Sequence, residues 1–132
     1  MIINKFNQNI IGTNNLSLND LFISSFNFLI HEKRLVVKIS DEKNEDKHTI
    51  IFEKLFELRF SSINGYTQYF NEEVYEWEMI PNNFVNDNFI EETKNLYLAN
   101  GRKWNEDLFA VRFLMSNMDE IKIICECIRF NE

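Results

Sequence analysis

The chain has 132 residues, of which 45% are hydrophobic and 14% aromatic, and it carries a formal net charge of −7. This apolar content excludes a disordered chain, and the length suits a single domain spanning residues 1–132. Lys and Arg number 14 against 21 Asp and Glu and form no basic run. We therefore expect no nucleic acid and no anionic membrane as a partner, whereas a basic protein is favoured electrostatically. The acidity is also explained by solubility alone.

No segment reaches the ~20 consecutive apolar residues that cross a bilayer. Residues 1–12 lack the apolar stretch of a secretory signal, and the chain has only two cysteines. These features predict a cytoplasmic protein in a reducing compartment.

The first half of the chain reads as strands. Residues 25–31 and 34–40 are apolar and β-branched, and the two residues between them predict a hairpin. Residues 49–60 form a longer strand-like run, in which Ile50, Phe52, Phe56, Leu58 and Phe60 mostly share a face. Lys54 interrupts this run, which indicates a bulge.

The second half contains one strand, one helix and a final hairpin. Residues 73–80 alternate in polarity, and residues 108–115 and 120–130 predict a hairpin whose apolar faces are covered on both sides. In its second strand, one face carries Ile124, Ile128 and Phe130, and the other carries Ile121, Ile123, Cys125 and Cys127. Asn88 and Glu91 predict a capping box at the start of a helix that ends at Asn100 and Gly101. One face of this helix carries Phe89, Thr93, Leu96 and Tyr97. Together the pattern predicts an α+β fold, a mostly antiparallel curled sheet or partial barrel with one main helix packed on it.

The residue types that carry catalysis or bind metals form no convincing constellation. Cys125 and Cys127 read as small core residues, with a metal site or redox chemistry as minor alternatives. His31 and His48 read as ordinary strand-edge residues that antiparallel pairing brings close together, and the acidic run 41–47 reads as a solvated hairpin loop. We predict no catalytic residue, no metal site and no cofactor, and hence no enzyme.

The strand at 73–80 carries the most informative cluster. It alternates so that Tyr75, Trp77 and Met79 point one way and its neighbours the other. Acidic residues around aromatic anchors suit a protein-binding surface. The predicted contact strip is Glu72, Glu73, Tyr75, Glu76, Trp77 and Glu78. A solvated edge strand, protected by charge against aggregation, is the alternative.

Three segments carry a resemblance to a known family. Residues 18–28 lead into a hairpin strand, residues 49–60 follow with their I-x-F pattern and the Arg59-Phe60 pair, and residues 119–130 close the chain. This outline resembles the small bacterial immunity-type proteins of polymorphic toxin systems. The resemblance implies tight binding to a cognate toxin, and it assigns no binding residue.

The sequence therefore predicts an immunity-like inhibitor that binds and neutralises a cognate toxin or effector through an acidic surface. The first alternative is a structural or homodimeric assembly protein without catalytic activity. The second is a small enzyme or ligand-binding barrel, which needs a cavity with convergent polar groups.

Overall fold

The structure is a computed structural model that describes residues 1–13, 16–61, 73–80, 88–115 and 119–132. Within the strand at 73–80, the only side chains that it describes are those of Val74 and Trp77. The elements of the described residues are β1 (Ile2–Ile3), the 3₁₀ turn η1 (Gln8–Ile10), β2 (Leu21–Leu29), β3 (Arg34–Ser40), β4 (Asp46–Glu53), β5 (Glu57–Ser61), β6 (Glu73–Ile80), α1 (Phe89–Ala99), β7 (Phe109–Met115), β8 (Glu120–Cys125) and β9 (Cys127–Phe130).

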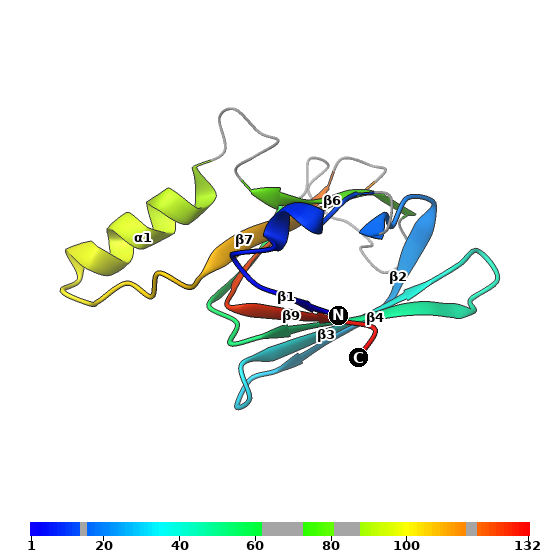
Figure 1. Ribbon diagram of the computed structural model, residues 1–132, viewed down its shortest axis with the longest axis horizontal. Coiled ribbons are helices and arrows are strands. Elements are labelled where there is room, and N and C mark those ends of the chain that lie inside the picture. Colours follow the sequence, from blue (N-terminus) through cyan, green and yellow to red (C-terminus); the bar gives the residue numbers. More distant parts are fainter. Residues whose placement is uncertain (14–15, 62–72, 81–87, 116–118) are drawn as a thin grey trace.

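The strands form one antiparallel sheet in the order β1-β9-β4-β3-β2-β6-β7-β8-β5. Two long strands are each bent in the middle, because β4 continues into β5 and β8 continues into β9. The bent strands pair with each other through both halves, β4 with β9 and β5 with β8. Strands far apart in the sheet order are thus joined by the chain, and the sheet curls around its core (Figure 1). The predicted α+β class with a curled antiparallel sheet is confirmed.

The bend between β4 and β5 lies at Lys54, whose φ of 52° is left-handed. The backbone N–H of Leu55 donates to the carbonyl of Lys33, and that of Phe56 to the carbonyl of Ile124. The irregularity expected at Lys54 is therefore present, but it divides the run 49–60 into two strands, so the expectation of one long strand is wrong. Phe52 is fully buried, but Phe56 turns outward and is 37% exposed, because the left-handed residue breaks the alternation.

A second break separates β8 from β9 at Glu126, whose N–H donates to the carbonyl of Glu53. We expected Ile128 and Phe130 on the face opposite Ile123. Instead all three lie in the main core, because the irregular residue shifts the alternation.

β7 is buried along its whole length, as the doubly apolar pattern predicted. Val111 and Phe113 face the main core inside the curled sheet. Ala110 faces outward into a smaller cluster with Ile124 and with Phe89 of α1. The helix therefore covers the outer face of the sheet beside β7 and β8.

The helix is confirmed, but its predicted N-terminal cap is wrong, since the Asn88 side chain makes no capping hydrogen bond. Phe89 and Thr93 are buried against the sheet as expected. Leu96 was expected on the same face and is 66% exposed. With 11 residues, α1 is the longest helix in the described part of the chain, where none has the length and apolarity to cross a membrane.

Candidate functional site

A groove lies between the second half of α1 and the start of β5. Its volume is about 570 Å³, and it is lined by Phe56, Glu57, Thr93, Leu96, Tyr97, Asn100 and Arg102. α1 stands at one end of the longest axis, away from the β3–β4 hairpin at the other end (Figure 1). The groove is thus open to solvent on an extremity of the molecule.

Two local features of the chain position the groove. The bend before β5 sends the side chain of Phe56 toward the helix. At the other side, Gly101 has a φ of 74° and closes α1 with paired hydrogen bonds, from its own N–H to Leu98 and from the N–H of Arg102 to Tyr97. This double pattern is a Schellman motif. It ends the helix at the groove and holds the backbone of Arg102 beside Tyr97.

The walls of the groove are aromatic. The rings of Phe56, Tyr97 and Trp104 meet edge to face, with centroid separations of 5.1, 5.2 and 5.9 Å. Trp104 is 7% exposed and belongs to the small cluster beneath α1, so it anchors the other two rings. The arrangement presents partly exposed ring faces that are held in place by buried neighbours, which suits recognition.

A carboxylate lies in the lining among these rings. The Thr93 hydroxyl lies 2.8 Å from Glu57 Oε2 and 2.9 Å from the carbonyl oxygen of Phe89. The hydroxyl has a single proton and donates it to one acceptor at a time, and the charged carboxylate is a stronger acceptor than the carbonyl oxygen. Arg59 Nη2 lies 3.4 Å from the other oxygen, Oε1. The Glu57 side chain keeps 31% of its surface exposed.

One cation stands at the rim of the groove. The guanidinium carbon of Arg102 lies 5.6 Å from the centroid of the Tyr97 ring, within cation–π range. The groove therefore joins aromatic faces, the Glu57 carboxylate and two guanidinium groups, that of Arg102 over Tyr97 and that of Arg59 paired with Glu57. Sequence reasoning missed this site. The predicted helix face did contain Thr93 and Tyr97, but nothing in the pattern showed that β5 would bend toward them.

The predicted contact strip lies on β6, and only part of it is described. Trp77 is 1% exposed and stacks between core rings, so its assignment as a surface contact is wrong. The register of β6 against β7 shifts between Val74 and Glu76, and this bulge turns both Val74 and Trp77 into the core. Glu72 lies outside the described residues, and so do the side chains of Glu73, Tyr75, Glu76 and Glu78. The alternative of an edge strand is also wrong, since β6 lies between β2 and β7.

The other sequence candidates gain no chemistry from the fold. Cys125 is fully buried and Cys127 half-buried, both as free thiols, and burial raises the pKa of each. His31 lies in the β2–β3 turn, whereas His48 pairs with Ile39 near the far end of β3, so the expected proximity is wrong. Among the described residues, His, Cys, Asp and Glu form no group of three or more with metal-binding geometry.

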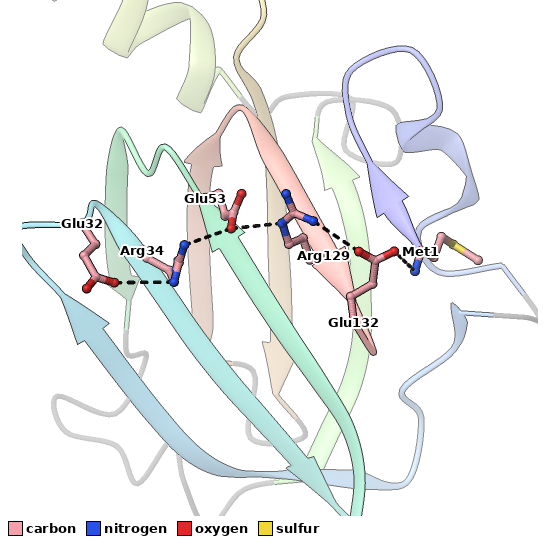
Figure 2. A network of polar contacts seen from close by, with 6 residues as sticks. All are labelled: Met1, Glu32, Arg34, Glu53, Arg129 and Glu132. Carbon is pink, nitrogen blue, oxygen red and sulfur yellow. Dashed lines mark hydrogen bonds and ion pairs between the residues drawn. The ribbon is translucent and has the colours of Figure 1, made fainter.

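The outer face of β3, β4 and β9 holds a chain of ion pairs (Figure 2). Glu53 accepts contacts from Arg34 at 3.3 Å and from Arg129 at 3.0 Å. The chain ends at Glu32 on one side and at Glu132 and the N-terminal ammonium of Met1 on the other. Three carboxylates face two guanidinium groups and one ammonium. The ion-pair chain is therefore balanced in charge, and it ties the two termini together.

Comparisons with known proteins identify the fold only. No protein-family model and no curated protein matches the chain. Among solved structures, it is similar to an uncharacterised protein from Neisseria gonorrhoeae, with a TM-score of 0.51 and 12% sequence identity. The match covers 100% of this chain and 98% of that chain. At this identity the likeness shows a shared fold, and the two chains share it over nearly their whole length.

Proposed function

We propose that this chain is a non-catalytic binding protein of the immunity type, which neutralises a basic toxin or effector protein in the cytoplasm by binding to it. The observation that carries the proposal is the groove between α1 and β5, where exposed aromatic and aliphatic side chains surround the Glu57 carboxylate. Aromatic residues at a concave site are the usual anchors of protein interfaces. A net charge of −7 would accelerate encounter with a basic partner.

Acidic residues occur at the groove end of the molecule together with cations. Glu91 and Glu92 lie exposed in the first turn of α1, and Glu57 on β5 pairs with Arg59. The ion-pair chain of Figure 2 on β3, β4 and β9 instead balances its own charges. Trp77 no longer belongs to the predicted contact strip. The other residues of that strip, Glu72, Glu73, Tyr75, Glu76 and Glu78, stay in the proposal as a second candidate contact.

The first experiment is a pull-down of the tagged full-length chain from its native host, followed by mass spectrometry. The proposal expects one basic protein in stoichiometric amount, whose binding persists at low salt and weakens at high salt. Recovery of the bait alone, repeated under several expression conditions, would contradict the proposal.

A captured partner then allows the contact surface to be mapped by charge reversal. We expect Glu57→Lys to slow association in a surface-binding assay, because a charge at the interface acts mainly on the on-rate. The double change Glu76→Lys with Glu78→Lys tests the β6 strip in the same way. Glu42→Lys, at the exposed tip of the β3–β4 hairpin, is the matched control for net charge. Each single variant changes the net charge by two and the double variant changes it by four. Effects that follow the change in net charge, equal for Glu57→Lys and Glu42→Lys and larger for the double variant, would indicate steering by net charge without a defined site.

One observation favours homodimer assembly as a second candidate. Among the strands that the structure describes, β5 is the last in the sheet order, and three of its five residues are exposed. Exposed edge strands are templates for pairing with another chain. Light scattering after size-exclusion chromatography separates the candidates, since a monomer at all concentrations removes the homodimer.

A further inference from the structure

We infer that the groove between α1 and β5 receives a single arginine or lysine side chain of the partner protein. The inference rests on the proposed function and names the chemistry of its anchor. It follows from two properties of the groove, an oriented carboxylate and aromatic walls, and the cation at its rim supplies a test.

The carboxylate of Glu57 is oriented before any partner arrives. Thr93, which is 8% exposed, donates to Oε2, and Arg59 forms an ion pair with Oε1 at 3.4 Å. The side chains of this pair are 43% and 31% exposed, so the pair is weak and an incoming cation can compete with it. A carboxylate has about four acceptor positions, so these contacts leave capacity for an incoming donor. Because the carboxylate is already held by neighbours, binding costs little side-chain ordering. A charge-assisted hydrogen bond from a guanidinium or ammonium group is the strongest contact such a group makes.

The walls suit the same ligand. Phe56 is 37% exposed and meets Tyr97 edge to face, so ring surface borders the carboxylate. Ring faces attract cations, and the aliphatic stem of Arg or Lys packs well against exposed apolar side chains such as Leu96. The protein already uses this chemistry within its own chain, since the guanidinium of Arg102 lies over Tyr97.

Arg102 also makes the inference falsifiable in both directions. Its charge opposes an incoming cation, so removing that charge should tighten binding of a basic side chain. If the groove instead receives an anion, Arg102 is the group that attracts it, and the same change should weaken binding. The affinity for a neutral aromatic ligand would change little when the charge of Arg102 or that of Glu57 is removed.

The test uses the full chain and three short capped peptides. These are acetyl-Gly-Arg-Gly-amide, the same peptide with citrulline in place of arginine, and acetyl-Gly-Glu-Gly-amide. Citrulline keeps the shape of arginine and removes the charge. Amide shifts in heteronuclear NMR report binding, which we expect to be roughly millimolar for a single anchoring residue. The arginine peptide should shift resonances of Glu57, Thr93 and Tyr97, and the other two peptides should not.

Variants then assign the effect to the groove. Glu57→Gln keeps the size of the side chain and an acceptor for Thr93, and it should weaken the arginine peptide by about tenfold or more. Arg102→Gln should strengthen it. Glu42→Gln, the matched control, should leave it unchanged. Spectra that stay native away from the groove exclude misfolding. Equal binding of the arginine and citrulline peptides, shifts elsewhere, or weaker binding in Arg102→Gln would each overturn the inference.

The outcomes separate this inference from the proposed function. A captured basic partner that binds Glu57→Gln as tightly as the original chain would leave the proposed function standing and remove the arginine pocket. Specific binding of the arginine peptide without any captured protein would keep the arginine pocket and remove the proposed function. If the peptide is displaced when the chain dimerises, the side chain in the pocket belongs to a second copy, which contradicts a partner of another kind.

Discussion

Replacing Trp77 by Ala tests whether this residue belongs to the core or to a contact surface. The indole is 1% exposed and stacks at 5.9 Å from Phe113 and 5.8 Å from Phe130. Its N–H donates to the backbone carbonyl of Leu16. A buried Trp hides roughly 150–250 Å², which at about 25 cal/mol/Å² corresponds to ~4–6 kcal/mol. Truncations of this kind typically cost about 3–5 kcal/mol. We therefore expect a loss of about 4 kcal/mol, a large part of the stability of a small domain.

Urea unfolding followed by far-ultraviolet circular dichroism measures this loss without relying on the fluorescence of the removed residue. Trp77→Phe is the control, because it keeps much of the ring packing and leaves the Leu16 carbonyl without its donor. We expect it to cost about 1–3 kcal/mol. A loss below about 1 kcal/mol in Trp77→Ala, together with lost partner binding, would refute the buried assignment and restore the predicted strip.

Three further predictions follow from single residues. Gly101→Ala should destabilise the protein by about 1 kcal/mol in urea unfolding, because its φ of 74° strains an L residue while no atom within 4 Å opposes the new methyl group. Burial lowers the pKa of His48 below its ordinary value of 6.5, so the unfolded chain binds the proton more readily and stability should fall as the pH drops below that value. His48→Gln should reduce the difference between urea midpoints at about pH 5 and about pH 8. In thiol labelling of the native protein, Cys127 should react slowly and Cys125 only after unfolding, because burial raises the pKa of both and Cys125 has no exposed surface.

The elements were predictable where one local pattern determined them. β3 and β6 have the predicted bounds, and the β7–β8 hairpin forms where the sequence placed it. The stop at Gly101 was equally clear, since a left-handed residue after a helix favours glycine. These features depend on alternation or on one backbone conformation. Both are properties of a few adjacent residues.

The errors in strand burial share a physical cause, because each follows a break in alternation whose effect on the downstream residues the residue types do not show. Lys54 adopts a left-handed conformation without being Gly or Asn. The shift between Val74 and Glu76 in β6 moves Trp77 to the core face, although the polarity pattern around it stays regular. Since side chains alternate with a period of two, one irregular residue exchanges the faces of everything after it. Burial assignments fail downstream of such a point even when the strand itself is correct.

The groove arises from the irregularity at Lys54, which the sequence marked as a bulge within one strand and not as a bend between two strands. Had β4 and β5 formed one regular strand, Phe56 would share the face of the buried Phe52 and would not reach Tyr97. The bend at Lys54 instead turns Phe56 outward and places Glu57 within reach of Thr93 on α1. A left-handed non-glycine residue costs roughly 1–2 kcal/mol, and the carboxylate and rings that it brings together are the groups that the proposed partner would contact. Lys54→Gly should therefore stabilise the fold and keep the groove, whereas a side chain that favours the extended conformation at this position should straighten the strand and weaken partner binding.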